Sequence, residues 1–248
     1  MNRAATRARR RPSQPLVGPS VRAAPLGAAA SGAITQLLTE RQRHQLASVA
    51  SRLQLPRKMI LFREDSPATS IWIVGTGVVK AFRALPRGKR QIMAFLFASD
   101  VFGLAQNGRY VNTTQSVTPV TLYRIPFDTL VTILRRDSEL EFQFLCKVAH
   151  ELRELQRRAL IVGRRDAPGR LAMFVSMLAR NTRHDDTGQR PIPVPMSRLD
   201  IAEYLNLTPE ALSRASRRLA RNGIISFTDR HTVQITNRAR FDELVNAL

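Results

Sequence analysis

The sequence has a single cysteine, Cys146, and only 19 acidic side chains against 39 basic ones. One cysteine excludes a disulfide framework and any metal cluster held by several cysteines. On its predicted helix, Cys146 is expected to act as a small apolar residue rather than as a redox switch. No apolar run approaches the about 18 residues of a membrane-spanning helix, and residues 1–33 lack the apolar core of about 7–15 residues that a signal peptide needs. These absences predict a cytoplasmic protein without a membrane partner.

The excess of basic side chains gives a formal net charge of +20. Such a charge indicates a polyanionic partner, most simply a nucleic acid. Residues 1–33 contain six arginines, no acidic residue and no helical or strand period, so removing them still leaves +14. We expect this segment to be a disordered basic tail that adds nonspecific attraction to DNA.

The most informative stretch is 196–225, MSRLDIAEYLNLTPEALSRASRRLARNGII, which is typical of two short helices joined by a tight turn. Ser197 and Asp200 have the capping-box spacing, in which each side chain satisfies a backbone donor at a helix start. Asn206 tolerates the left-handed backbone that a turn between two helices requires. Thr208 then suits the N-cap of a second helix, followed by a proline at its first position. The pattern predicts a helix-turn-helix.

The second of these helices is predicted to have one apolar and one polar face. The apolar residues recur at helical spacing and are Leu212, Ala215 and Leu219. Near the start of the helix, the outward side chains are of the types that contact base edges in a major groove, and these are Glu210, Ser213 and Arg214. The residues suited to phosphate contacts, which supply affinity without sequence information, are Arg198, Thr208, Arg217, Arg218 and Arg221. The alternative is a solvated basic helix on an ordinary helical domain.

This stretch resembles the helix-turn-helix of the CRP/FNR superfamily of bacterial transcription regulators. Glu210, Ser213 and Arg214 match the Glu-x-x-Ser-Arg recognition signature of its FNR and FixK branch, whereas Pro209 stands where the branch of the cyclic-AMP receptor usually has an arginine. The resemblance covers nearly everything after residue 34. It implies a homodimer that binds double-stranded DNA at a TTGA-type palindrome and recruits RNA polymerase. The iron–sulfur cluster of FNR is not implied, because the chain has only one cysteine.

Between the tail and the helix-turn-helix, the residue period changes from helical to strand-like. A helical pattern covers 34–53 and ends in Leu53, and short β-rich runs separated by glycines follow Pro56. The runs are 59–62, 71–74, 78–82, 91–97, 114–117 and 121–125. Such spacing is typical of a sandwich or jelly roll. With the resemblance, it predicts an α+β protein in which 34–137 is a jelly-roll sensor domain.

The sensor domain departs from the cyclic-AMP receptor's branch at its nucleotide-binding positions. In that branch, a glutamate after a glycine holds the ribose and a later arginine neutralises the cyclic phosphate. Leu104 stands at the glutamate position and Asn112 stands near the arginine position. A buried phosphate without a cation is costly, so we do not expect a cyclic nucleotide, although Arg109 could in principle substitute.

Haem is another sensor group in this superfamily. The four histidines, His44, His150, His184 and His231, show no paired metal-ligand spacing, so we predict no cofactor from them. Haem stays open, and the alternative function is a ligand- or haem-responsive regulator whose DNA binding is gated by a small molecule. An enzyme on a jelly-roll scaffold would need clustered metal ligands or a nucleophile with a base, and the sequence of the roll offers neither.

Residues 138–162 return to a helical period, with an apolar seam at alternating steps of three and four. The seam consists of Leu145, Val148, Leu152, Leu155, Ala159 and Val162. A helix packed on its own roll would show a similar stripe. Dimerisation is favoured because a helix-turn-helix commonly reads a palindrome as a two-fold dimer, and a parallel helix pair would supply the axis.

The segment 138–165 is therefore predicted to be the dimerisation helix and hinge. The hinge, 163–168, should break the helix at a glycine and a proline, with Arg164 and Arg165 near enough to reach phosphate. The remaining residues, 166–248, are predicted to form a winged helix-turn-helix domain.

Overall fold

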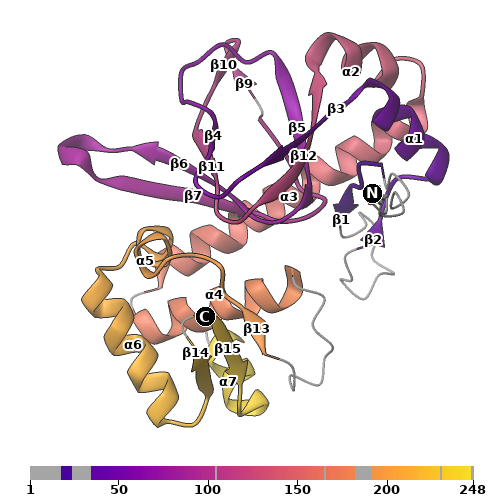
Figure 1. Ribbon diagram of the computed structural model, residues 1–248. Helices are drawn as coiled ribbons and strands as arrows, with labels where there is room; N and C mark the ends of the chain where they lie inside the picture. The colour runs from indigo at the N-terminus through magenta and orange to yellow at the C-terminus, as the bar shows by residue number, and fades with distance from the viewer. Residues whose placement is uncertain are drawn as a thin grey trace, which may run out of the picture.

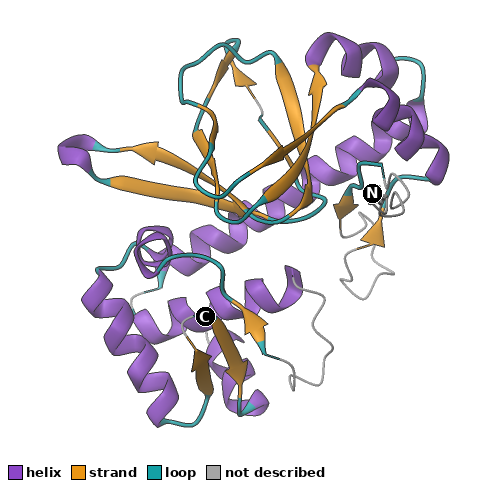
Figure 2. Cartoon of the chain, in the orientation of Figure 1, coloured by secondary structure: helices purple, strands orange, loops and turns teal. Residues whose placement is uncertain are grey.

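The computed structural model describes residues 18–23, 35–103, 105–164, 166–181, 191–229 and 231–246. A strand-rich domain and a smaller domain of helices and strands are connected by one long helix, α3 (Figure 1; Figure 2). This arrangement confirms the predicted α+β class, with an N-terminal jelly roll and a C-terminal winged helix-turn-helix domain.

The strand-rich domain is a roll of two four-stranded antiparallel sheets, with strand orders β4-β11-β6-β7 and β3-β12-β5-β8. Val79, Leu96 and Leu122 are among the buried side chains that fill the space between the sheets. Each of the six predicted β-rich runs falls on a strand, whereas β3, β8, β9 and β10 were not predicted. The strands are β3 (Ser51–Leu55), β4 (Ile60–Phe62), β5 (Ser70–Thr76), β6 (Val79–Ala84), β7 (Arg90–Leu96), β8 (Val101–Phe102), β9 (Ala105–Gln106), β10 (Arg109–Tyr110), β11 (Thr113–Ser116) and β12 (Val120–Pro126), with a 3₁₀ turn, η1 (Pro86–Gly88), between β6 and β7.

The first helix, α1 (Glu40–Val49), is shorter than predicted. Thr39 begins it with a capping box, in which the Thr39 hydroxyl accepts the Gln42 backbone N–H at 3.3 Å. Ala50 is extended and ends the helix. Leu53 lies on β3 opposite a residue of β12, so the helical prediction for Leu53 is wrong. The physical reason is the five-residue antiparallel pairing of β3 with β12, which a short helical pattern cannot reveal.

The N-terminal segment contains a short strand, β1 (Arg22–Ala23), which pairs with β2 (Thr35–Gln36). Val21 and Ala23 are fully buried, and Val21 belongs to an apolar cluster with side chains of α1, β5, β12 and the two helices that follow β12. The prediction of a disordered tail over 1–33 is therefore wrong for this strand, because burial of its apolar side chains orders it. Most of the remaining tail lies outside the described residues.

Two helices follow the roll. The first, α2 (Phe127–Leu134), was not predicted and buries Leu130 and Ile133. The second, α3 (Ser138–Gly163), begins after Asp137, whose carboxylate accepts a backbone N–H in the first turn at 2.9 Å. The long predicted helix is thus present and leads from the roll to the C-terminal domain.

The described part of the C-terminal domain has four helices and a three-stranded sheet of order β13-β15-β14. Its elements are α4 (Ala167–Asn181), β13 (Ile192–Pro193), α5 (Arg198–Leu205), α6 (Pro209–Arg221), β14 (Ile225–Asp229), β15 (Thr232–Ile235) and α7 (Arg238–Asn246). Pro168 lies in the first turn of α4, where a proline is compatible with a helix because its missing N–H would have no partner. The prediction that the break extends through Pro168 is therefore wrong. The connection between α3 and α4 is shorter than the predicted hinge of 163–168. In the part of the chain that the structure describes, no helix has both the length and the apolar character needed to cross a membrane.

Candidate nucleic-acid interface

The turn between α5 and α6 has the predicted conformation. Asn206 is left-handed, with φ 51° and ψ 50°. Thr208 then caps α6, because its Oγ1 accepts the Ala211 backbone N–H at 3.1 Å, and Pro209 occupies the first helical position. Leu207, between them, packs against the apolar core. These local contacts fix the angle at which α6 leaves the turn.

The start of α5 has only one of the two hydrogen bonds of the predicted capping box. Ser197 Oγ accepts the Asp200 backbone N–H at 3.1 Å, as a capping residue should. The Asp200 carboxylate is buried and lies 2.5 Å from Lys80 Nζ of the roll. The reciprocal half of the predicted capping box is therefore wrong, because an oppositely charged partner from another domain engages the carboxylate.

Helix α6 has one buried and one exposed face. The predicted inward residues Leu212, Ala215 and Leu219 are at most 3% exposed. Ser216 is also buried, which the sequence analysis missed, and its hydroxyl donates to the Leu212 carbonyl at 2.9 Å. The predicted outward residues are exposed, except for a half-buried Ser213, and they are Glu210, Ser213, Arg214, Arg217, Arg218 and Arg221. Four of them line a shallow, open depression: Arg214, Arg217, Arg218 and Arg221. The outer face of α6 is thus a strip of positive charge with one carboxylate near its start.

The Glu210 carboxylate is fully exposed in the first turn of α6. Its pKa is lowered because the carboxylate accepts a hydrogen bond from its own backbone N–H and a second from the Thr208 hydroxyl, with the Arg214 charge as a smaller contribution. The group is therefore ionised at neutral pH and can only accept hydrogen bonds. Such a side chain would repel a phosphate but can accept from an exocyclic amino group of a base.

Two of the predicted phosphate-contacting side chains are already oriented by neighbours. Arg217 Nη2 donates to Ser213 Oγ, one helical turn earlier, at 3.1 Å. Arg198, at the first position of α5, lies over the ring of Phe227 on β14, with 5.9 Å between the guanidinium carbon and the ring centre. Because both contacts are on the exposed face, the guanidinium groups remain accessible to a ligand.

Arg170 of α4 is a residue that the sequence analysis missed. Its Nη1 donates to the Leu205 and Asn206 carbonyls at 3.1 and 3.0 Å, and its Nε donates to the Arg164 carbonyl at 2.7 Å. The side chain thus satisfies carbonyls at the C-terminal end of α5, which have no partner within the helix. It also ties the turn to the end of α3. Nothing in the local sequence around Arg170 indicates this role.

Arg164 does not have the predicted access to phosphate. Its side chain is only 11% exposed, with Nε 3.0 Å from Asp166 Oδ1. Its Nη1 donates to the Leu244 carbonyl of α7 at 2.9 Å. The prediction for Arg164 is therefore wrong, because these partners hold the guanidinium between α3 and α7. Arg165 lies outside the described residues.

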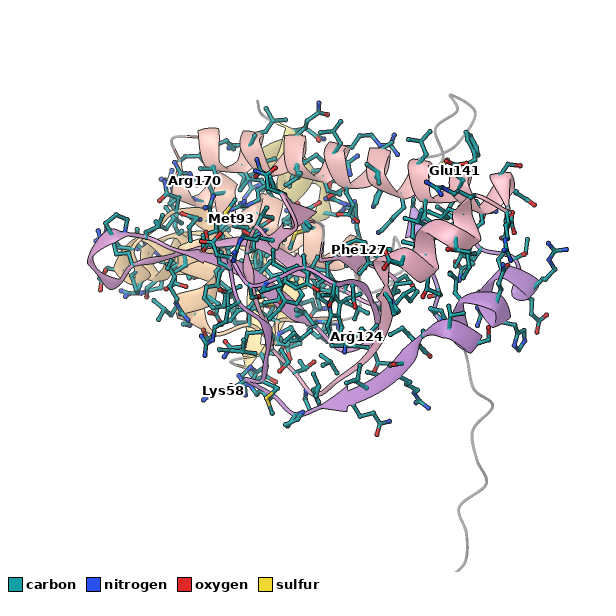
Figure 3. The ribbon with its side chains drawn as sticks, turned by 90° about the horizontal axis from the view of Figure 1, so that it is seen from above. Lys58, Met93, Arg124, Phe127, Glu141 and Arg170 are labelled. Carbon is teal, nitrogen blue, oxygen red and sulfur yellow. The ribbon has the colours of Figure 1, made fainter. Side chains whose placement is uncertain are left out.

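Helix α3 runs along one side of the molecule (Figure 3), and most of the predicted seam on it is exposed. Four of its apolar residues are 51–57% exposed: Leu145, Val148, Leu152 and Leu155. Ala159 is exposed and Val162 is half-buried. Phe142 and Leu160, outside the predicted seam, are exposed as well. The buried residues of α3 are a different set, Leu140, Cys146, Lys147, His150 and Ile161. The stripe is therefore not explained by packing of α3 on its own roll.

Two family models match the chain, a cyclic nucleotide-binding domain over residues 52–137 and a Crp-like helix-turn-helix domain over residues 169–244. The structure of FixK2 from Bradyrhizobium japonicum is similar to this one, with a TM-score of 0.73 and 30% sequence identity over 81% of this chain and 99% of that chain. The chain belongs to the CRP/FNR family.

Curated CRP/FNR relatives match at a similar level. The nitrogen fixation regulation protein FixK of Azorhizobium caulinodans is 29% identical, over 80% of this chain and 81% of its own length. The transcriptional activatory protein AadR of Rhodopseudomonas palustris is 28% identical, over 80% of this chain and 83% of its own length. As a member of the CRP/FNR family, the protein is a transcription regulator with a helix-turn-helix DNA-binding domain, and the family contains regulators rather than enzymes.

In this CRP/FNR protein, aromatic side chains fill the roll beside β10. Phe62 and Tyr110 stack with 3.7 Å between ring centres, and Trp72 Nε1 donates to the Tyr110 hydroxyl at 3.3 Å. Phe102 stacks on Trp72 at 6.3 Å. Gly103 adjoins this cluster with φ +90°, and a Cβ there would lie 2.8 Å from Trp72, so only glycine fits without displacing the ring.

The residues compared with the cyclic-nucleotide contacts of the CRP/FNR family lie near this cluster in the sequence. Leu104 lies outside the described residues, and Asn112 is half-buried. Arg109, the possible substitute cation, is exposed and donates from Nη1 to the Asp65 carbonyl at 2.5 Å. These two described side chains therefore provide no buried cation for a cyclic phosphate.

The histidines have different surroundings. His44 is exposed on α1, 3.8 Å from Glu40, and His231 is exposed in the wing. His150 is buried on α3, and its pKa is lowered by burial and by the nearby Lys147 charge. His184 lies outside the described residues. Among the residues that are described, no group of three or more His, Cys, Asp or Glu side chains could hold a metal ion. The absence of a cofactor therefore stays a prediction.

Proposed function

We propose that the protein is a homodimer that reads a TTGA-type palindrome with the exposed face of α6, and that the bound dimer recruits RNA polymerase. The observation that carries this proposal is the grouping of Glu210, Ser213 and Arg214 at the start of a helix whose opposite face is buried. In a helix-turn-helix, the N-terminal residues of the second helix contact base edges. Arg214 can donate two hydrogen bonds to a guanine, and the ionised Glu210 can accept from a cytosine or adenine amino group.

The exposed seam on α3 supports the dimer. Four apolar side chains that are each more than half exposed form a stripe along one helix, and a contiguous exposed apolar stripe is typical of a protein interface. Parallel pairing with α3 of a second copy would cover the stripe by knobs-into-holes packing. The same two-fold axis would relate two α6 helices in the way that a palindrome requires.

The proposal is tested by titrating labelled duplexes with the protein at physiological salt. We expect the TTGA-type palindrome to bind about 10³-fold or more tightly than a duplex of scrambled sequence. A palindrome with one half-site scrambled should bind with intermediate affinity, because only one α6 would find its bases. Equal affinity for all three duplexes would contradict the proposal and would leave α6 as a nonspecific basic helix.

Cyclic AMP and cyclic GMP should have no effect on this protein. Asn112 and Arg109 provide no buried cation, and an unpaired buried phosphate would cost several kcal/mol. Isothermal titration calorimetry with each nucleotide should show no binding heat, and neither nucleotide should change the affinity for the palindrome. Micromolar binding that tightens DNA affinity would refute this prediction and favour the small-molecule-gated alternative.

Removing residues 1–17 should lower nonspecific DNA affinity without changing the preferred site. These residues carry five arginines and no acidic side chain, and the slope of log K against log salt should fall by about 0.9 for every arginine that binds a phosphate in the intact protein. The deletion stops before Val21, whose side chain is fully buried. Changing the five arginines to glutamine in the full chain is the matched control and should give the same result. A different preferred sequence in either variant would show that the tail contacts bases.

A further inference from the structure

The helix-turn-helix is attached to the roll by a buried ion pair. Lys80 of β6 and Asp200 of α5 approach to 2.5 Å between Nζ and Oδ1, and the two residues are only 6% and 7% exposed. They are 120 positions apart in the sequence. In Figure 1 the β6–β7 hairpin lies above α5, and the ion pair joins β6 to α5.

Polar contacts from the neighbouring strand reinforce this attachment. Arg90, the first residue of β7, donates from Nη2 to both carboxylate oxygens of Glu203 on α5, at 3.3 and 3.2 Å. Gln91 Nε2 donates to the Glu203 backbone carbonyl at 2.6 Å. One helical turn of α5 therefore has both of its acidic side chains engaged by the roll.

An apolar contact also joins the roll to the C-terminal domain. Phe95 of β7 packs against Tyr204 of α5 and Phe174 of α4, with ring centres 5.2 and 6.1 Å apart. Arg158 of α3 lies over the Tyr204 ring, with 5.0 Å between its guanidinium carbon and the ring centre. It also donates a hydrogen bond to the Ile92 carbonyl of β7. Residues of the roll and of the C-terminal domain thus belong to one continuous apolar cluster.

A buried ion pair is a poor source of net stability, because removing two charges from water costs about as much as their attraction returns. Its stronger effect is on geometry, since a shift that kept the two surfaces in contact but parted Lys80 from Asp200 would leave a buried charge without its partner. Fixing α5 also fixes α6, because Thr208 caps the short turn between the two helices and Leu207 of that turn packs against the apolar core. The contact between α5 and the β6–β7 hairpin therefore helps to set the direction of α6 relative to α3, together with the contacts of Arg158, Arg164 and Arg170.

We propose that Lys80 and Asp200, supported by Arg90 and Glu203, are positioning residues that set the spacing between half-sites that the dimer accepts. This inference rests on the proposed function, in which α3 supplies the dimer axis and α6 reads each half-site. Inserting one base pair moves the half-sites apart by about 3.4 Å and rotates one relative to the other by about a tenth of a turn. A domain held at a fixed angle cannot follow that change, whereas a domain tethered only by its connection to α3 can.

The test compares two substitutions of Lys80, one that reverses its charge and one that removes it, with a matched control on the same strand. Lys80→Asp places a carboxylate opposite Asp200, and Lys80→Met removes the charge while keeping a long side chain. Arg83→Asp is the control, because Arg83 is on the same strand but pairs with Glu64 inside the roll at 2.7 Å. Each full-length variant is titrated against palindromes with the spacer shortened by one base pair, unchanged or lengthened by one base pair, and against a single half-site. Sedimentation and thermal unfolding identify any variant that fails to dimerise or to fold.

For the wild type and Arg83→Asp, changing the spacer by one base pair should lower the affinity for the palindrome by about ten-fold or more. This is the loss expected from one mismatched base pair in a site. The Lys80 variants should bind the optimal palindrome about ten-fold more weakly, if the competent orientation falls to about one-tenth of the population. They should discriminate between spacers by less than about three-fold, with half-site affinity unchanged.

A spacer profile of Lys80→Met identical to that of Arg83→Asp would overturn the positioning role while leaving the proposed DNA-binding function intact. Tighter binding of the Lys80 variants to the optimal palindrome would also overturn it, because the contact would then oppose DNA binding. If the wild type itself preferred no palindrome, the proposed function would have failed first.

Discussion

Replacing Leu152 and Leu155 together with Asp should convert the dimer into monomers. The two residues lie in the middle of the exposed seam, and each Asp would be buried without a partner when a second α3 packs against it, at a cost of several kcal/mol. Leu152 and Leu155 are 57% and 55% exposed in the single chain, so the substitutions should not impair folding of the monomer. Sedimentation velocity at micromolar protein should show a folded species of one chain, with an unfolding temperature below that of the wild type because the stabilisation from dimerisation is lost.

Arg157→Asp is the control for this prediction, because it adds an acidic side chain to the same helix outside the seam. That variant should remain a dimer. The double variant should bind the palindrome only as tightly as a single half-site, since the additional affinity that comes from linking two α6 helices in one dimer is lost. A dimer that survives both Asp substitutions would place the interface on another surface.

Arg214→Ala should weaken binding to the palindrome far more than binding to random DNA. Two hydrogen bonds from one arginine to a guanine provide about 1–3 kcal/mol of discrimination, which is roughly 5- to 150-fold per half-site. Random duplexes offer that guanine only by chance, so their affinity should fall much less. Glu210→Ala should instead relax specificity at one base position, because the carboxylate repels phosphate and contributes only through a base contact.

Arg218→Ala and Arg221→Ala are matched controls on the same exposed face. Both lie further along α6, nearer the DNA backbone in this family of folds, and should weaken the palindrome and the random duplex about equally. If each arginine binds one phosphate, as proposed, each substitution should reduce the salt slope by roughly one unit. If Arg214→Ala lowered both affinities by the same factor, Arg214 would be a phosphate contact and the base-reading assignment would be wrong.

The sequence predicted α6 well because every signal for it is local. Thr208, Pro209 and the spacing of Leu212, Ala215 and Leu219 determine where the helix begins and which face is buried, without reference to the rest of the chain. The same helical period also predicts which side chains of α6 are exposed. For these reasons the candidate site could be specified residue by residue.

The parts that were missed depend on distant partners. Asp200 has the spacing of a capping box, but Lys80 from the roll engages its carboxylate, and no local pattern links the two positions. Arg170 holds the helix-turn-helix from α4 in the same nonlocal way. Leu53 fits a helical period as well as a strand alternation, and only its pairing with β12 decides between them. Local chemistry therefore predicts the candidate recognition helix, whereas the contacts that orient it emerge only from the fold.

In the proposed function, this chain reads a symmetric DNA sequence through paired α6 helices. The most direct measurement is selection of bound duplexes from a random library by the full-length protein, followed by sequencing of the retained pool. We predict enrichment of two TTGA-type half-sites related by two-fold symmetry with one preferred spacer. Retention of the library without enrichment of any sequence, or enrichment of a single asymmetric site, would contradict the account.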